Sequence, residues 1–226
     1  MWRSLAIAGA TVGSDPHYVS TTLNPYRHGP GAAPLLLATS VLFLLLASGV
    51  WGQQPLTGVP NVVETAPDFS LQQRGGGPMV RLSTLRGQDV ALVFSSATCP
   101  VFASQVNGLI ALATRYSQVR FYMVYVREAH PSDGAKAPEI PGIPPSKVTL
   151  PMAKGLGEKA AHADKCAREF ALPFPILVDG MDNAVELAYS GWPYRLYLID
   201  KAGRVRFGKA GFPVLAEFEG ALRRLQ

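Results

Sequence analysis

The fold is decided by residues 90–102, which read VALVFSSATCPVF. The run 90–94 is continuously apolar, as expected for a strand that is buried on both faces of a parallel sheet. Pro100 follows it, and proline is favoured in the first turn of a helix. Beyond this proline, apolar side chains recur at the spacing of one helix face, at Phe102, Val106, Leu109, Ala113 and Tyr116. The stretch therefore predicts a buried strand, a short turn and a helix, with Cys99 at the junction.

Strands and helices alternate along the rest of this region. The apolar run 121–126 predicts a second buried strand, and the Pro- and Gly-rich stretch 131–151 lacks periodicity, as a long functional or mobile loop would. Further strands are expected at 68–71, 79–82, 176–178, 196–199 and 205–207, and further helices at 156–170, 182–189 and 215–225. Asp182 is expected to cap the short helix that it begins. This alternation predicts an α/β fold with a central sheet flanked by helices on both faces.

An apolar segment precedes this region. Residues 32–51 carry no charged side chain and are about 20 long, enough to span a bilayer as a helix. Their densest part, 35–46, is about as long as the apolar region of a signal peptide. Arg27 precedes the segment and Arg74 is the first basic residue after it, so the positive-inside rule predicts export of the chain beyond Trp51. We expect a cleaved signal peptide or an uncleaved membrane anchor; a buried core helix is disfavoured, because residues 1–31 offer no core.

The composition narrows the function classes. Of the 226 residues, 48% are hydrophobic and 16% are charged, which excludes disorder as a description of the whole chain. Two cysteines exclude a disulfide-dense domain and a four-cysteine zinc site, and no metal is expected. The net charge of +5 comes from scattered basic residues, so no nucleic-acid partner is expected. The predicted organisation is a polar tail (1–31), a signal peptide or transmembrane anchor (32–51), a linker (52–65) and one folded domain (66–226).

Cys99 carries the clearest chemical signal. At a helix N-terminus the partial positive charge and the unpaired N–H groups favour an anion, so we expect a lowered thiol pKa and a reactive thiolate. The alternative is a buried cysteine that acts as a small hydrophobe. Phe102 stands where a C-x-x-C redox motif has its second cysteine. A covalent intermediate would therefore need an external thiol or Cys166, for which a buried structural role in its helix is the simpler interpretation.

Several segments resemble the iodothyronine deiodinases. Residues 95–102, SSATCPVF, are similar to the active-site segment of that family, which carries selenocysteine at the position of Cys99. Residues 128–134, EAHPSDG, are similar to a signature of the family, and further matches lie at 177–183, 188–189 and 195–199. The resemblance covers about residues 66–210. It implies a thioredoxin-like fold, with a central mixed sheet flanked by helices.

The resemblance also implies a chemistry, the reductive dehalogenation of an aromatic iodide. Cys99 would be the nucleophile and His130 the proton handler, since imidazole titrates near neutrality. Glu128 would orient the histidine, and Thr98 would hydrogen-bond the thiolate. The resemblance implies that Arg195, Ser132 and Asp133 bind the substrate. It implies no cofactor, a small-molecule substrate, an external thioredoxin- or glutathione-like thiol reductant, and a homodimer as one arrangement.

Plainer roles compete for these residues. Thr98 could serve as a helix cap, Glu128 as a solvated loop charge, and Arg195 as half of a structural ion pair. The chain also departs from the family. It has cysteine in place of selenocysteine, and residues 147–151 lack a histidine. Further departures lie at Ala97, at Ala135 and at residues 211–213. These departures concern the hormone pocket more than the redox site, so thyroxine is not expected as the natural substrate.

Other functions remain open at this point. A thiol peroxidase would use the same cysteine, but peroxiredoxins place threonine three residues before it, where this chain has Ser96. A thioredoxin-like disulfide oxidoreductase shares the fold. A non-catalytic, membrane-tethered module fits the missing second cysteine, although such a module would have no need of the motif around His130.

Overall fold

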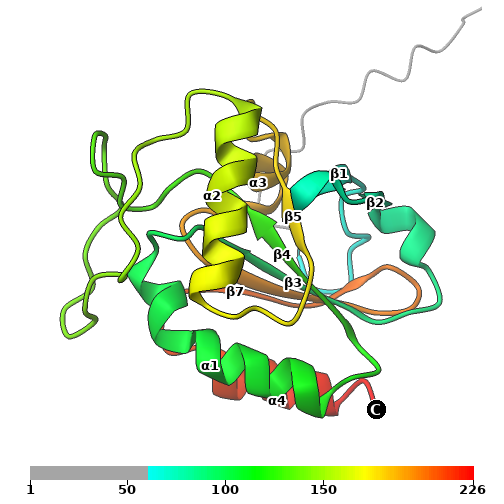
Figure 1. Ribbon diagram of the computed structural model, residues 1–226. Helices are drawn as coiled ribbons and strands as arrows, with labels where there is room; N and C mark the ends of the chain where they lie inside the picture. The colour runs from blue at the N-terminus through cyan, green and yellow to red at the C-terminus, as the bar shows by residue number, and fades with distance from the viewer. Residues whose placement is uncertain (1–60) are drawn as a thin grey trace, which may run out of the picture. The chain divides into compact units, whose positions relative to one another are not determined.

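The computed structural model describes residues 61–226, which form one α/β unit (Figure 1). The predicted export segment 32–51 lies outside the described residues. The strands are β1 (Ser70–Gln73), β2 (Met79–Arg81), β3 (Val90–Ser95), β4 (Arg120–Tyr125), β5 (Ile176–Val178), β6 (Arg195–Ile199) and β7 (Val205–Ala210). The helices are α1 (Pro100–Arg115), α2 (Leu156–Glu169), α3 (Ala184–Tyr189) and α4 (Leu215–Arg223), with 3-10 turns η1 (Arg74–Gly76) and η2 (Leu82–Leu85). The predicted strand and helix order is confirmed.

The strands form one mixed sheet in the order β2-β1-β5-β4-β3-β6-β7. β3 is parallel to β4 and β4 is parallel to β5, whereas the outer neighbours pair antiparallel. β3 therefore lies inside the sheet, and every residue of it is buried. Parallel neighbours end at the same edge, and Ser95 lies opposite Tyr125 in the register. The segments that follow β3 and β4, which carry Cys99 and Glu128, therefore emerge side by side.

Two apolar clusters cover the two faces of the sheet. In β3, Ala91 and Val93 point into the cluster that contains the buried side chains of α1, α2 and α4. Val90, Leu92 and Phe94 point into the cluster on the other face, which contains Tyr189 of α3. Because β3 is covered on both sides, it reads as an unbroken apolar run rather than an alternating one. The prediction of helices on both faces is confirmed.

The start of α3 differs from the prediction. The residue before the helix is Asn183, with φ at 54°. The side chain of Asn183 makes no capping hydrogen bond to the helix. The carboxylate of Asp179 instead accepts hydrogen bonds from the backbone N–H groups of Gly180 (2.9 Å), Val185 (3.2 Å) and Glu186 (2.8 Å). Asp182 accepts one, from Ala184, at 3.3 Å. The prediction that Asp182 caps α3 was therefore wrong, because the chain turns back after β5. Asp179, the residue that follows this strand, thereby reaches the first N–H groups of the helix.

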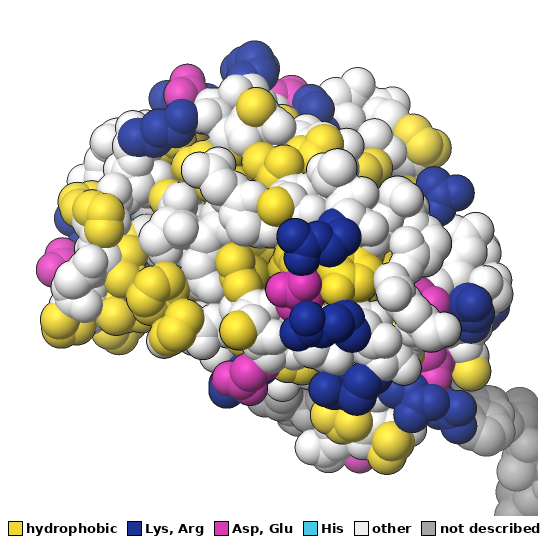
Figure 2. All heavy atoms as spheres, turned by 90° about the horizontal axis from the view of Figure 1, so that it is seen from below, with side chains coloured by type: hydrophobic (Ala, Val, Ile, Leu, Met, Phe, Trp, Pro, Cys, Tyr) yellow, Lys and Arg dark blue, Asp and Glu magenta, His cyan; other side chains and the backbone are white. Residues whose placement is uncertain are grey.

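The surface that carries α1 and α4 mixes both signs of charge (Figure 2). Glu219 lies between Arg115 and Arg223, at 2.7 Å and 3.9 Å. Apolar side chains gather at the end of this face where the loop 131–151 lies. Within residues 61–226, no helix combines the length and the apolar character that crossing a bilayer requires.

Candidate active site around Cys99

Cys99 lies where the sequence predicted it, directly before the first residue of α1. Its carbonyl accepts the backbone N–H of Ala103 (3.0 Å), and its own N–H donates to the carbonyl of Ser96 (3.3 Å). The turn from Ser95 to Cys99 is buried throughout, and Cys99 itself is 1% exposed. The thiol is therefore enclosed by protein in this structure.

The burial of Cys99 has the largest effect on the pKa of its thiol. Burial raises the pKa of the Cys99 thiol above its ordinary value. The backbone N–H groups of Phe102 and Val101 and the hydroxyl of Ser95 lower it, as a helix N-terminus should, while the charge of Glu128 raises it further. The expected lowering of the pKa was wrong, because removal from water outweighs the local field of the helix. The thiol is thus mostly protonated at neutral pH, and reaction requires that its proton be taken up nearby.

Glu128 is the hub of a buried hydrogen-bond network. Its side chain is 2% exposed. One carboxylate oxygen accepts the backbone N–H of Thr98 (3.1 Å) and the hydroxyl of Thr98 (2.7 Å). The other oxygen accepts the hydroxyl of Tyr125. Glu128 as a solvated loop charge was therefore wrong, and Thr98 does not cap α1 with its side chain, since its hydroxyl is bound to this carboxylate.

His130 is linked to this network through its backbone. Its N–H donates to the hydroxyl of Thr98 (3.0 Å), so Glu128 holds this segment indirectly. The residue is half-buried, and its side chain approaches Lys136 and Glu139 of the loop 131–151. Burial lowers the pKa of its imidazole, and Lys136 lowers it further, while Glu139 opposes the shift. A largely neutral imidazole at the rim of the site can accept a proton as well as pass one on.

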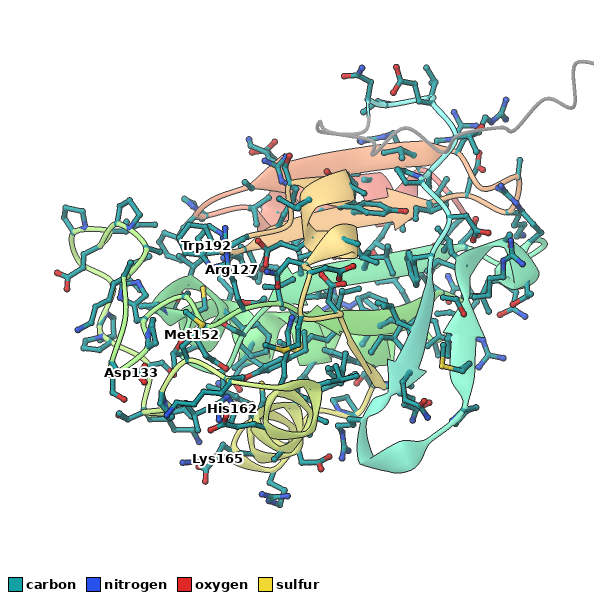
Figure 3. All side chains as sticks on the ribbon, turned by 90° about the horizontal axis from the view of Figure 1, so that it is seen from above. Arg127, Asp133, Met152, His162, Lys165 and Trp192 are labelled. Atoms are coloured by element: carbon teal, nitrogen blue, oxygen red, sulfur yellow. The ribbon has the colours of Figure 1, made fainter. Side chains whose placement is uncertain are left out.

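Two residues of the network, Tyr125 and His162, were not predicted from the sequence. Tyr125 is buried at the end of β4, and its hydroxyl also accepts the backbone N–H of Ala97 (3.2 Å). His162 lies on α2, nearer the sheet than Lys165 (Figure 3), and its Nδ1 is 3.5 Å from a carboxylate oxygen of Glu128. The single available signal for His162 was that it shares a helix face with Cys166, four residues later.

The two cysteines are both free and both buried. Burial strongly raises the pKa of the Cys166 thiol, and the charges of Glu128 and Cys99 raise it further. Phe102 and Phe170, one helical turn beyond each cysteine, pack edge to face with their ring centroids 5.2 Å apart. The two cysteines belong to one apolar cluster.

The predicted substrate residues occupy different places. The backbone N–H of Ser132 donates to the carbonyl of Leu150 (2.9 Å), and the carboxylate of Asp133 accepts the N–H of Met152 (2.7 Å). Both residues thus close the base of the loop 131–151. Arg195 instead donates from Nε to the carbonyl of Ser190 (2.9 Å), beside α3 and on the other face of the sheet. The structure does not bring Arg195 to Cys99, and Arg195 has no ion pair among the described residues.

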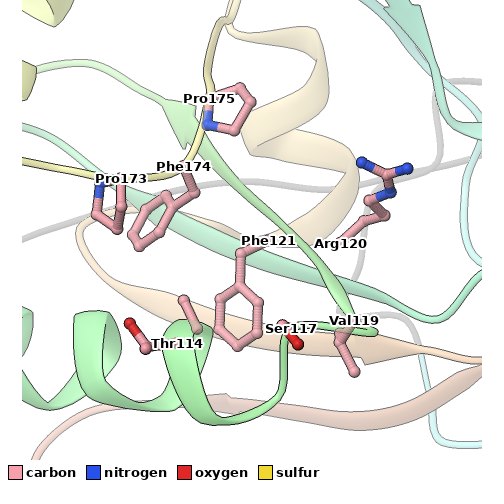
Figure 4. Close-up of a pocket in the computed structure, with 9 residues that line it drawn as sticks. Thr114, Ser117, Val119, Arg120, Phe121, Pro173, Phe174 and Pro175 are labelled. Atoms are coloured by element: carbon pink, nitrogen blue, oxygen red, sulfur yellow. The ribbon is translucent and has the colours of Figure 1, made fainter.

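Two hollows help to define the site. One, of about 200 Å³, is lined by Val126, Arg127, Glu128, Met152, Ala153, Lys159, Met181 and Asn183. The guanidinium of Arg127 lies 4.7 Å from the ring centroid of Trp192 and 3.0 Å from a carboxylate oxygen of Glu186 (Figure 3). The other hollow, of about 270 Å³, includes Thr114 and Ser117 at the far end of α1 from Cys99 (Figure 4). Its lining contains no cysteine, histidine or acidic residue, whereas the lining of the first hollow includes Glu128.

Comparison with known proteins decides the family. The sequence profile of the family described as iodothyronine deiodinase matches residues 82–218. The chain belongs to the iodothyronine deiodinase family. It is 31% identical over 179 residues to the thyroxine 5-deiodinase of Gallus gallus, covering 76% of this chain and 67% of that one. It is 38% identical over 99 residues to the type II iodothyronine deiodinase of Gallus gallus, covering 42% and 34%.

The chain thus spans between about one third and two thirds of the length of these two deiodinases. Among solved structures it is similar to an uncharacterized conserved protein from Geobacillus kaustophilus, with a TM-score of 0.54 and 21% identity over 75% of this chain and 84% of that one. It is also similar to the thioredoxin domain of a thiol-disulfide oxidoreductase from Bacteroides vulgatus, with a TM-score of 0.50, 14% identity, and coverage of 72% and 98%. The fold of this deiodinase-family chain is thioredoxin-like.

No group of three histidine, cysteine, aspartate or glutamate side chains within residues 61–226 lies close enough together to hold a metal ion. The network next to Cys99 consists of a threonine, a tyrosine, a carboxylate and a histidine, and the backbone N–H of His130 is attached to it. Groups of this kind store and move protons, and a thiol supplies the nucleophile.

Proposed function

We propose that this deiodinase-family protein is a thiol-dependent oxidoreductase that removes halogen from a small aromatic halide. The observation that carries the proposal is the position of Cys99, at the N-terminus of α1 and next to the Glu128 network. The nucleophile and a proton-handling group are thereby joined through one residue, Thr98. An external thiol of the thioredoxin or glutathione type would be the reductant, and no cofactor is invoked.

The reaction balances with thiols alone. In the first step the sulfur of Cys99 takes iodine from the ring, a carbon–iodine bond breaks, and the thiol proton ends on the ring carbon. In the second step an external thiol attacks the sulfenyl iodide, which releases iodide and a proton and leaves a mixed disulfide. A second thiol then restores Cys99 and leaves as half of the external disulfide. The substrate is reduced by two electrons, and the two external thiols are oxidised.

The protein's own groups serve the first step. The N–H groups of Val101 and Phe102 and the hydroxyl of Ser95 stabilise the thiolate. His130, at the rim, exchanges the proton with the substrate side. The Thr98 hydroxyl, bonded to Glu128 and to the backbone N–H of His130, holds His130 in this place. Ser132 and Asp133 shape the loop base beside the substrate rather than contacting Cys99.

The site also has to admit the substrate. Because Cys99 is enclosed, we propose that the exposed part of the loop 131–151 moves when an organic halide binds, while Ser132 and Asp133 hold its base. The hollow bordered by Arg127, Lys159 and Glu128 offers a cationic wall for an acidic substituent of that substrate. Arg195 would take part only if its bond to Ser190 were released.

The test compares two activities of the full chain. We expect dithiol-dependent release of iodide from iodotyrosines or iodothyronines, and we expect Cys99→Ser to abolish it. Cys166→Ser is the matched control, because it removes a buried thiol that is not required when the external thiol is in excess. Consumption of hydroperoxide in place of iodide release would establish a thiol peroxidase. The proposal would be refuted if both activities were absent, or if activity survived Cys99→Ser. The non-catalytic module would then be the remaining interpretation.

We also propose that residues 32–51 export the domain, as a signal peptide or as an anchor in the membrane. The domain would then lie on the periplasmic or extracellular side. Protease added to cells whose outer envelope has been opened should digest it while a cytoplasmic marker survives. Protection of the domain until the cells are lysed would contradict export. A homodimer is testable by the mass of the purified full chain in solution.

A further inference from the structure

His162 is a buried histidine without a conventional hydrogen-bond partner. Its side chain is 8% exposed, and its Nδ1 is one of the few buried polar atoms within residues 61–226 that make no hydrogen bond. The charged or polar group facing this atom is the carboxylate of Glu128, at 3.5 Å. Burying an imidazole nitrogen in this way is costly, so a position that retains it calls for an explanation.

Glu128 is the second member of this buried pair. Its two oxygens already accept the N–H and hydroxyl of Thr98 and the hydroxyl of Tyr125. Nδ1 of His162 lies beside the oxygen that Tyr125 also binds. Shortening the gap from 3.5 Å to an ordinary hydrogen bond needs a small movement of α2.

The charge of Glu128 acts on four titratable groups around the pair. It raises the pKa of the Cys99 thiol, the Tyr125 hydroxyl and the Cys166 thiol, in each case after burial as the larger cause. It also opposes the lowering of the pKa of Lys159 that burial produces. These groups come from the turn before α1, from β4 and from α2, so the pair lies at the centre of the cluster. A proton added to the pair would remove most of that charge.

We infer that Glu128 and His162 share the proton that Cys99 releases, and that His162 is the positioning residue that holds this proton until it is delivered. The inference rests on the proposed function and goes beyond it, because neither the sequence signature nor the expected roles of the family residues include a histidine on α2. It assigns the proton store to the α2 side of the cluster and leaves His130 as the exchanger at the rim.

The proton count of the first step fits one shared proton. Cys99 must lose a proton before its sulfur can attack iodine, and the ring carbon must gain one as iodine leaves. The pair takes the thiol proton, which turns carboxylate and neutral imidazole into carboxylate and imidazolium. The added positive charge offsets the charge of Glu128, which raises the pKa of the Cys99 thiol. Delivery through Thr98 to the ring carbon returns the pair to its first state, and no further reactant is consumed.

A first experiment needs no halide substrate. Alkylation of Cys99 by iodoacetamide in the full chain is followed by peptide mass spectrometry across about pH 5 to 10, which brackets the ordinary range of imidazole and thiol. Wild type should show two inflections, one from the pair and one from the thiol. His162→Gln keeps a polar group but cannot exchange a proton, so we expect one inflection and alkylation near neutral pH that is slower by about fivefold or more. Glu128→Gln removes the charge and should act in the opposite direction, with faster alkylation near neutral pH.

A second experiment measures turnover. If the pair stores the proton, His162→Gln should lower kcat for iodide release by about tenfold or more and leave KM within about threefold. Phe170→Leu is the matched control: it loosens α2 against α1 next to Phe102, and we expect it to lower stability while leaving both inflections in place. Circular dichroism establishes that each variant is folded before its rates are compared.

The outcomes distinguish failure of the shared proton from failure of the proposed dehalogenation. His162→Gln with a wild-type alkylation profile, or with kcat within about twofold of wild type, would overturn the shared proton. Phe170→Leu with the same profile as His162→Gln would also overturn it, because packing alone would then explain the effect. If wild type releases no iodide, the proposed function fails, while the alkylation profiles still decide whether His162 controls the charge beside Cys99.

Discussion

Thr98 joins Cys99 to the buried carboxylate, and replacing it by valine should separate the two. Valine has nearly the same shape as threonine and leaves no cavity, so the substitution removes a hydroxyl and little else. That hydroxyl donates to Glu128 at 2.7 Å and accepts the N–H of His130 at 3.0 Å. The backbone N–H of Thr98 continues to donate to Glu128 at 3.1 Å in the variant.

The magnitude is set by these two bonds. A hydrogen bond to a charged group contributes about 1.5 to 3 kcal/mol, and a buried donor left unsatisfied costs about 1 to 3 kcal/mol. His130 is half-buried, so water can satisfy part of its N–H. We therefore expect Thr98→Val to lower the free energy of unfolding by about 2 to 4 kcal/mol. Thr98→Ser keeps both bonds and loses one methyl group, which should cost about 1 kcal/mol.

Urea unfolding of the full chain, followed by circular dichroism, measures both variants under the same conditions. The difference between them isolates the hydroxyl, because both alter the apolar part of the side chain only slightly. Equal free energies of unfolding for Thr98→Val and Thr98→Ser would refute the reasoning, because the hydrogen bond from this hydroxyl to Glu128 would then contribute nothing to stability. A loss in Thr98→Val much greater than about 5 kcal/mol would also contradict it, because two hydrogen bonds do not account for so much.

Two further predictions concern the thiols and α3. Burial raises the pKa of the thiols of Cys99 and Cys166, so above about pH 8.5, where the unfolded thiols lose their protons, stability should fall as pH rises; full stability is present below that pH. Urea midpoints measured from about pH 7 to 10 should fall less steeply in the double variant Cys99→Ser/Cys166→Ala, and an unchanged slope would contradict this. Asp179→Ala removes three bonds to N–H groups and should cost about 2 to 4 kcal/mol, whereas Asp182→Ala removes one long bond and should cost under about 1 kcal/mol; equal losses in thermal or urea unfolding would show that the cap is misassigned.

Local signals account for the features that the sequence predicts correctly. The apolar run of β3 and the proline after Cys99 specify a strand and a helix within a few residues, so both elements and their junction are predictable. The same holds for the segment around Glu128 and His130, which comes directly after the apolar run of β4. These features need no knowledge of contacts between distant parts of the chain.

The missed features all depend on distant contacts. A lone histidine on a helix gives no local sign that it will face a carboxylate 34 positions earlier, as His162 does with Glu128. Glu128 itself has the residue type of a solvated charge, and its burial depends on donors from Thr98 and Tyr125. The pKa of Cys99 was misjudged for the same reason: the helix N-terminus is visible in the sequence, whereas enclosure of the thiol comes from tertiary packing.

The loop 131–151 is fastened at its base and free at its tip. The base is closed by the bond from Ser132 to Leu150 and by the hydroxyl of Ser146, which donates to the carbonyl of Ala97 (2.7 Å) in the turn before Cys99. Residues 138–145 between these anchors are mostly exposed and belong to no strand or helix. Insertions, deletions and grafts in this tip should therefore be tolerated without loss of the fold. Descendants of one ancestral chain can thus diverge in the molecules that they admit to the cysteine while inheriting the same proton-handling interior.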